Sequence, residues 1–199
     1  MNQQERLAAT AAPLLDWYEK NKRDLPWRRT RDPYKIWVSE IMLQQTRVAA
    51  ALPYYLRWME ELPDVNALAA VEEERLMKLW QGLGYYSRAR NLQRAAKVIV
   101  EELDGRFPDT WEGLRKLPGV GDYTAGAVAS IAFGRRVPAV DGNVLRVAAR
   151  VANIRENIMD LKVRRRLSEL MAAAVPSDRP GTYNQALMDL GATVCLPNG

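Results

Sequence analysis

Two carboxylates stand in sequence contexts that would give them different protonation states. Glu40 has mostly apolar neighbours three and four residues away on a helical pattern, so its carboxyl group should lose hydration and its pKa should rise. Asp141 directly precedes an amphipathic segment, where an N-cap aspartate accepts backbone hydrogen bonds and stays ionised. A neutral acid and an ionised carboxylate can together cleave a glycosidic bond. Two alternatives stay open: an exposed Glu40 on an amphipathic helix, and an Asp141 that only caps its helix.

The composition removes several other kinds of chemistry. The 199 residues include no histidine, which excludes Ser–His–Asp triads, histidine-ligated zinc and imidazole acid–base catalysis. The single cysteine, Cys195, excludes an internal disulfide. A net charge of +5 fits a nucleic-acid partner but also fits simple solubility. There is no apolar run of membrane-spanning length and no signal-peptide pattern, so we expect a cytoplasmic protein without a membrane segment.

The elements that must position these carboxylates are predicted to be helices. Apolar residues recur at helical spacing, no segment alternates as a strand does, and Pro and Gly breakers fall between the periodic segments. The sequence therefore predicts an all-α fold with short connections. The predicted helices cover residues 4–19, 35–44, 48–59, 72–81, 86–102, 123–133, 143–152, 161–174 and 183–194.

The segment Leu117–Ala129, with the sequence LPGVGDYTAGAVA, is the most informative motif. Pro118 ends the preceding segment, Gly119 and Gly121 permit a tight turn, and a helix then begins at once. Unpaired N–H groups at the start of such a helix form an anion site that suits a DNA phosphate. For an isolated Gly-x-Gly, a helix–helix turn without a ligand is the alternative.

Several further motifs accompany this hairpin in a fixed order. They are LPWR (25–28), DPY (32–34), WVSEIMLQQT (37–46), GLGYYSR (82–88), VDGNV (140–144) and NQALMDLG (184–191). From about residue 25 to residue 195 the chain thereby resembles the adenine DNA glycosylases of the helix-hairpin-helix, endonuclease III-like superfamily. The resemblance implies a helical barrel module over residues 29–134, with the helix-hairpin-helix at 110–133. It also implies a second helical module from residues 1–28 and 135–199, with a DNA-binding cleft between the two.

The resemblance assigns roles to individual residues. Glu40 matches the acid that protonates adenine N7 and then helps to activate water, and Asp141 matches the carboxylate that stabilises or transiently bonds the sugar carbon. Asn143 matches a residue that orients this aspartate. The implied substrate-binding residues are Arg28 and Gln185 at the flipped adenine, Gln45 and Tyr85 as wedges in the duplex, and also Leu43 and Thr46. The implied DNA-phosphate residues are Gly119, Val120 and Gly121. Without the resemblance, Tyr85 would be read as a core aromatic and Gln45 as a surface helix residue.

Position 123 separates the subfamilies. Members that also cut the strand have a lysine there because a Schiff base needs an amine, whereas Tyr123 cannot form one. We therefore expect a monofunctional hydrolase that flips and removes adenine mispaired with 8-oxoguanine or guanine in double-stranded DNA. We expect a monomer that binds DNA in the bacterial nucleoid. The alternatives are an endonuclease III-like glycosylase of other specificity and a non-catalytic helix-hairpin-helix DNA-binding module.

Cys195 matches the first ligand of the family's iron–sulfur (4Fe-4S) cluster. Such a cluster takes four thiolates and this sequence supplies one, so we expect a cluster in the intact protein but not on this chain, which we interpret as truncated. Taken alone, Cys195 would be a buried structural residue. The resemblance also implies a monovalent cation held by carbonyl groups of the hairpin.

Overall fold

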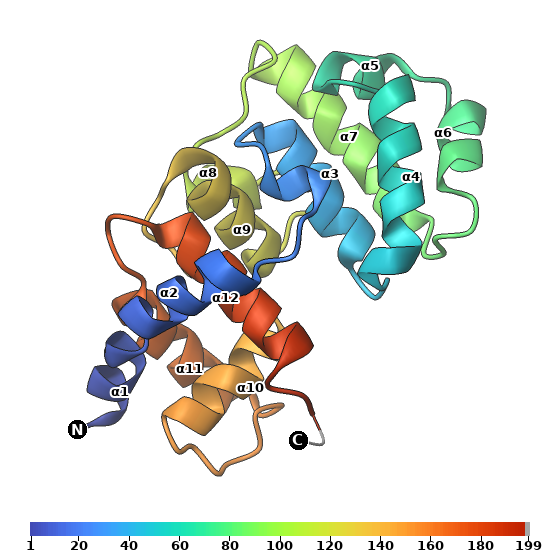
Figure 1. Cartoon of the computed structure of the whole chain (residues 1–199). Coiled ribbons are helices and arrows are strands. Elements are labelled where there is room, and N and C mark those ends of the chain that lie inside the picture. Colours follow the sequence, from blue (N-terminus) through green and yellow to red (C-terminus); the bar gives the residue numbers. More distant parts are fainter. Residues whose placement is uncertain (198–199) are drawn as a thin grey trace. The chain divides into compact units, whose positions relative to one another are not determined.

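The computed structural model describes residues 1–197, and these contain helices but no strand (Figure 1). The all-α prediction is therefore confirmed. The chain forms two compact units, one of residues Pro26–Val128 and the other of Met1–Leu25 with Ala129–Gly199. The family resemblance placed the corresponding borders after residues 28 and 134.

The unit Pro26–Val128 is built from consecutive helices. They are the 3-10 helix η1 (Pro26–Arg28) and the α-helices α3 (Pro33–Leu43), α4 (Val48–Glu61), α5 (Val65–Ala70), α6 (Glu73–Trp80), α7 (Ser87–Glu102) and α8 (Trp111–Arg115). Helix α9 (Asp122–Phe133) begins in this unit and ends in the other. Helix α7 packs against α3, α5 and α6, and α4 packs against α3 and α6 (Figure 1). The helix that bears Glu40, α3, is thus supported by two longer helices.

Aromatic side chains fix α4 against both α6 and α3. Trp58 and Trp80 meet edge to face with ring centroids 5.6 Å apart. The indole of Trp58 donates a hydrogen bond to the Tyr34 hydroxyl at 3.1 Å, and that hydroxyl donates to the Leu62 carbonyl at 2.6 Å. Burial raises the pKa of Tyr34, so this phenol stays protonated and remains a donor. The buried chain of donors therefore sets the position of the first turn of α3.

The other unit contains the two ends of the chain. Its helices are α1 (Gln3–Ala9), α2 (Ala11–Asn21), α10 (Gly142–Val151), α11 (Leu161–Ala174) and α12 (Pro180–Thr193). Helix α12 packs against both α2 and α10, and α11 packs against α1 and α10 (Figure 1). Most of α12 is buried, including Tyr183, Asn184 and Asp189. Helix α12 is therefore the central helix around which this unit is assembled.

Three details of the helix prediction were wrong. The helix predicted over residues 4–19 is two helices. The Thr10 hydroxyl donates to the Leu7 carbonyl at the end of α1, and Pro13 has no N–H to donate to the helical backbone hydrogen bonds. Helices α5 and α8 were missed. They have six and five residues, too few to show a periodic pattern, and each starts at a side-chain cap, Asp64 and Thr110 respectively.

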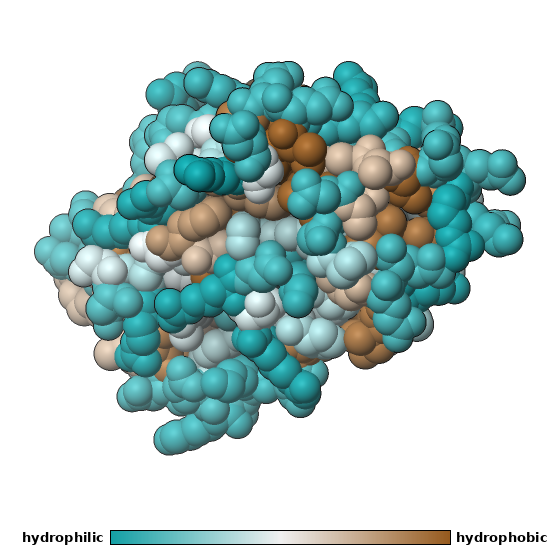
Figure 2. Space-filling view, turned by 90° about the horizontal axis from the view of Figure 1, so that it is seen from above, coloured by the Kyte–Doolittle hydropathy of each residue, from teal (hydrophilic) through white to brown (hydrophobic). Residues whose placement is uncertain are grey.

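The exposed surface is mostly hydrophilic. Figure 2 shows one face, on which polar side chains surround small apolar patches. Tyr85 is one of the exposed large side chains, with 65% of its surface accessible, so it is not a core aromatic. Among the described residues, no helix is long and apolar enough to cross a bilayer.

Candidate active site

Glu40 lies in the last turn of α3 and is buried, with 6% of its surface exposed. Asp32 caps the start of this helix by accepting from the Tyr34 N–H at 2.9 Å, and Pro33 suits the first helical position. The Tyr123 hydroxyl donates to Glu40 Oε2 at 2.6 Å. Burial excludes the alternative of an exposed surface glutamate. A short hydrogen bond from a phenol orients the carboxyl group within an apolar stripe.

The start of α9 is tied to the end of α3 by a second hydrogen bond. Gln44 Nε2 donates to Thr124 Oγ1 at 3.3 Å, next to the contact between Tyr123 and Glu40. Because Tyr123 comes only two residues after Gly121, the hairpin fixes where the phenol lies. The hairpin therefore positions the candidate acid as well as presenting its own backbone.

The three predicted phosphate-binding residues differ in what they do in the turn. Gly119 has a left-handed backbone with φ +75°, and a Cβ there would come within 2.6 Å of Asn91 Cβ. The Val120 side chain is buried, and its N–H donates to the Leu117 carbonyl at 3.1 Å. Gly121 is exposed, and a Cβ there would meet nothing within 4 Å. Gly119 therefore shapes the turn, while Gly121 offers open backbone at the start of α9.

Carbonyl groups of the hairpin already accept hydrogen bonds from side chains of α8. Arg115 Nη1 donates to the Val120 carbonyl at 2.9 Å, and Trp111 Nε1 donates to the Asp122 carbonyl at 3.1 Å. Arg115 also pairs with the Asp122 carboxylate at 2.5 Å. A monovalent cation at these carbonyls would compete with both side chains.

Asp141 is the N-cap of α10. Its Oδ1 accepts from the Val144 N–H at 2.7 Å, and its Oδ2 accepts from Asn143 Nδ2 at 3.2 Å. The capping role is thus present, and Asn143 holds the second oxygen as well. With both oxygens accepting hydrogen bonds, the carboxylate has one defined orientation at the start of the helix.

The support for Asp141 extends through Asn143 to the end of α12. Arg146 Nη2 donates to Asn143 Oδ1 at 2.8 Å and to the Gly191 carbonyl at 2.7 Å. A Cβ at Gly191 would lie 2.6 Å from Asn143 Cβ, so only glycine permits this approach of α12. Arg146 Nε also donates to the Cys195 carbonyl at 2.9 Å. The orientation of Asp141 therefore depends indirectly on residues that follow it by about fifty positions.

Two buried amides of α12 serve different contacts. Asn184 is fully buried, and its Nδ2 donates to Ser130 Oγ at 2.8 Å and to the Val137 carbonyl at 2.9 Å. Its Oδ1 accepts from the Ala139 N–H at 3.2 Å, so it fixes the extended segment that leads to Asp141. Gln185 is 9% exposed, and its Oε1 accepts from the Tyr18 hydroxyl at 3.0 Å.

Sequence reasoning missed several buried polar residues. Asp189 has 1% of its side chain exposed and pairs with Arg23, whose Nε donates to Oδ1 at 2.9 Å. The buried Arg88 and Asn184 and the partly buried Arg146 were likewise given no role. For Arg88, Asn184 and Asp189 the only signal was a polar residue inside a largely apolar motif, and such a signal does not reveal the partner.

The remaining predicted substrate residues lie in the unit Pro26–Val128. Arg28, Leu43 and Thr46 are partly exposed, while Gln45 and Tyr85 are exposed. Both Gln45 and Tyr85 have left-handed backbones, with φ 58° and φ 46°. Glu40 and Tyr123 belong to this same unit, whereas Asp141, Asn143 and Gln185 belong to the other.

Cys195 does not make an iron–sulfur site with the residues present. A 4Fe-4S cluster takes four thiolates, and the sequence has one cysteine. Within residues 1–197, no group of three or more His, Cys, Asp or Glu side chains could hold a metal ion. Instead, Cys195 Sγ accepts a hydrogen bond from Arg150 Nη1 at 3.1 Å.

A glycine-rich hairpin that leads into a helix and holds a buried carboxyl group is typical of helix-hairpin-helix proteins. The family described as "HhH-GPD superfamily base excision DNA repair protein" matches residues 38–173, so the chain belongs to this superfamily. The resemblance to the helix-hairpin-helix superfamily is thereby confirmed.

Individual relatives extend this comparison. A mouse protein named adenine DNA glycosylase is 50% identical over 96% of this chain. The match covers 39% of the mouse protein. The chain spans 37–39% of the length of the mammalian relatives it matches. A thermostable thymine-DNA glycosylase has a TM-score of 0.85 and 29% identity, over 97% of this chain and 89% of that one. A trapped endonuclease III–DNA complex shares the fold, with a TM-score of 0.81 and 22% identity. The match covers 100% of this chain and 91% of that one.

Proposed function

We propose that this chain is the catalytic region of a monofunctional DNA glycosylase that hydrolyses the N-glycosidic bond of adenine. The proposed substrate is double-stranded DNA in which that adenine is mispaired with 8-oxoguanine or guanine, and the proposed acting form is a monomer. The observation that carries the proposal is the buried Glu40 carboxyl group, hydrogen-bonded at 2.6 Å by a phenol at position 123. The 50% identity to a relative named adenine DNA glycosylase supports the choice of base.

In the proposed reaction, Glu40 in its acid form protonates adenine N7. The electron pair of the glycosidic bond then leaves with the base, and positive charge develops on the sugar carbon. Asp141, held by Val144 and Asn143, stabilises that charge or bonds the carbon transiently. Water attacks the carbon and gives its proton to the Glu40 carboxylate, which restores the acid.

Tyr123 supports a reaction that ends with water. A lyase of this superfamily would need an amine at this position for a Schiff base, and a phenol cannot form one. The hydroxyl of Tyr123 instead donates to Glu40, so its role is to orient the acid. Arg28 and Gln185 are proposed to contact the extruded base, together with Leu43 and Thr46.

DNA is proposed to be gripped by the backbone of the hairpin and opened by side chains. The exposed backbone at Gly121, at the start of α9, suits a phosphate, since helix N-termini bind anions. Gln45 and Tyr85 are exposed and would enter the duplex where the adenine leaves it. Extruding a base costs a few kcal/mol, which wedge and phosphate contacts must offset.

The test is release of free adenine from a defined duplex by the protein. We expect release from a duplex with adenine opposite 8-oxoguanine and none from an A:T duplex. Glu40→Gln should abolish release while DNA binding survives. Glu101→Gln, at an exposed glutamate of α7, is the matched control and should retain full activity.

Three outcomes would count against parts of the proposal. Full activity of Glu40→Gln would remove the acid assignment. A covalent adduct trapped with borohydride would show lyase chemistry instead of hydrolysis. Binding of mismatched DNA without release of any base, by a well-folded protein, would favour the non-catalytic binding module.

A further inference from the structure

Two exposed side chains project from backbone positions that amino acids other than glycine rarely adopt. Gln45 and Tyr85 have φ 58° and φ 46°, in the left-handed region. Such conformations are energetically unfavourable and persist only where surrounding contacts enforce them. Gln45 follows the end of α3, and Tyr85 follows the turn Gly82-Leu83-Gly84 after α6. A contact that stabilises both must act on both segments.

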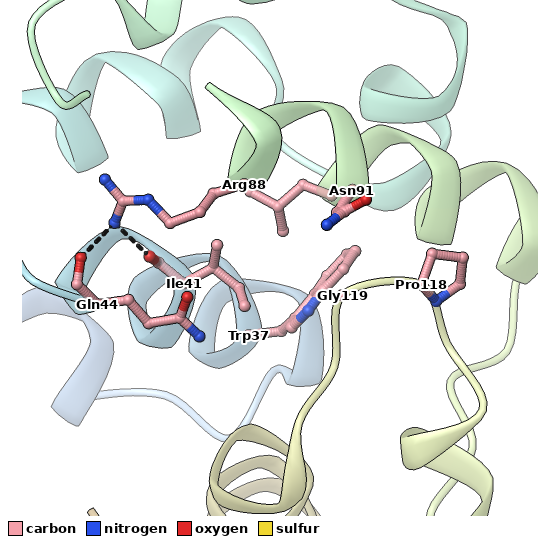
Figure 3. A pocket seen from close by; sticks show the side chains of 8 residues that line it. Trp37, Ile41, Gln44, Arg88, Asn91, Pro118 and Gly119 are labelled. Atoms are coloured by element: carbon pink, nitrogen blue, oxygen red, sulfur yellow. Dashed lines mark hydrogen bonds between the residues drawn. The ribbon is translucent and has the colours of Figure 1, made fainter. Parts of the chain in front are cut away.

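Arg88 makes that contact with a single guanidinium (Figure 3). Its Nη1 donates to the carbonyls of Ile41, Met42 and Gln44 at 2.9, 3.2 and 2.5 Å. Its Nη2 donates to the carbonyls of Leu83 and Gly84 at 2.9 and 3.1 Å. The peptide carbonyls immediately before Gln45 and before Tyr85 are therefore both bound by one side chain.

The position of Arg88 is itself fixed by burial and by aromatic rings. Only 9% of the residue is exposed, and its guanidinium lies over the rings of Trp80 and Tyr85, at 5.2 and 5.6 Å from their centroids. Trp80 also donates from Nε1 to the Gly84 carbonyl at 2.9 Å. Since Trp80 is fully buried, this anchors the second segment to the core.

We infer that Arg88 is a positioning residue that holds Gln45 and Tyr85 in their left-handed conformations, so that both wedges are ordered before DNA binds. The inference rests on the proposed function, in which these two side chains enter the duplex. If the wedges are already ordered in the free protein, the step that extrudes the base does not have to supply the free energy of ordering them. Arg88 itself acts through the backbone and need not touch DNA.

Arg88→Lys is the decisive variant. An ammonium keeps the charge but lacks the planar fork that reaches five carbonyls in two directions. A cavity of about 70 Å³, lined by Trp37, Asn91 and Gly119 among others, adjoins the side chain (Figure 3). This space can take water beside the smaller head group, so we expect the variant to fold.

The readouts separate wedge positioning from general DNA binding. For Arg88→Lys we expect the single-turnover rate of adenine release to fall roughly 10²-fold, as expected when reacting groups are misplaced. When 2-aminopurine replaces the target base, its fluorescence rises on extrusion, and we expect this rise to be smaller for Arg88→Lys than for the wild type. Affinity for an undamaged duplex should hold, since the charge is kept. Arg94→Lys, at an exposed arginine further along α7, should match the wild type in all three measurements.

A double-mutant cycle tests whether Arg88 acts through a wedge. In a Tyr85→Ala background, Arg88→Lys should cause much less further loss, because residues that act as a unit are non-additive. A full, additive loss in that background would overturn the inference. A lowered melting temperature with an unchanged rate and unchanged fluorescence would also overturn it, since Arg88 would then be only structural.

The outcome stays distinguishable from failure of the proposed function. If the wild type releases no adenine from any duplex, the function is wrong. Hydrogen exchange of the free protein then tests whether Arg88 orders the two segments. Arg88→Lys should speed exchange at residues 42–46 and 83–87 but not in α4 or α9. Exchange that is unchanged there, or raised throughout the unit, would contradict the inference.

Discussion

The carboxyl groups of Glu40 and Asp141 are held in opposite ways. Glu40 is buried, and its donor Tyr123 is 83 residues away in the sequence. Asp141 is only partly buried, and its donors Val144 and Asn143 lie within three residues of it. The surroundings of Glu40 are therefore made by tertiary packing, whereas those of Asp141 are made by a local helix cap. Changes to packing should therefore act directly on the first carboxyl group, and on the second only through the contacts of Asn143.

The largest expected effect is loss of the chemical step when either carboxylate is replaced. For Asp141→Asn we expect the single-turnover rate of adenine release to fall roughly 10²–10³-fold, because a fixed negative charge near a developing cation is lost. Asparagine is as good an N-cap as aspartate, so thermal unfolding should barely change. A normal rate in Asp141→Asn would reduce this residue to a cap and make Glu40 the single functional carboxyl.

The next effect concerns the hairpin that positions Tyr123. Gly119→Ala should destabilise the protein by roughly 2–4 kcal/mol, because it combines an unfavourable φ of +75° with a Cβ 2.6 Å from Asn91. Gly121→Ala is the matched control, since its Cβ meets nothing within 4 Å. Chemical denaturation of both variants measures the difference. Equal stabilities would mean that the turn is less constrained than its geometry indicates.

A smaller effect is expected when the tertiary hydrogen bond to Glu40 is removed. Tyr123→Phe deletes the hydroxyl that donates at 2.6 Å and leaves the ring in place. Glu40 becomes a carboxylate as it gives its proton to adenine, and hydrogen bonds to charged groups contribute roughly 1.5–3 kcal/mol, so the rate of adenine release should fall by roughly 10–100-fold. Single-turnover kinetics at fixed pH would measure this. An unchanged rate would show that other contacts orient the acid.

The same contrast explains what the sequence could and could not predict. The cap at Asp141 was predictable because a capping residue and its helix are adjacent in the chain, and helical periodicity predicted the all-α fold. The partners of Arg88, Asn184 and Asp189 lie up to 47, 54 and 166 residues away, and no local pattern encodes such pairings. The left-handed backbones of Gln45 and Tyr85 were not predictable either, because neither residue type indicates a positive φ.

The smallest expected effect isolates the local cap from its remote support. Asp141→Ala removes the acceptor of the Val144 N–H and should cost about 1 kcal/mol of stability, whereas Asp141→Asn should cost almost none. Arg146→Met breaks the contacts with Asn143 and Gly191 but leaves the cap itself. If the cap needs no tertiary support, Asp141→Ala should be less stable than Asp141→Asn by the same amount whether position 146 is Arg or Met. Denaturation of all four combinations measures this, and a difference that disappears with Met at position 146 would show that Asp141, like Glu40, depends on tertiary packing.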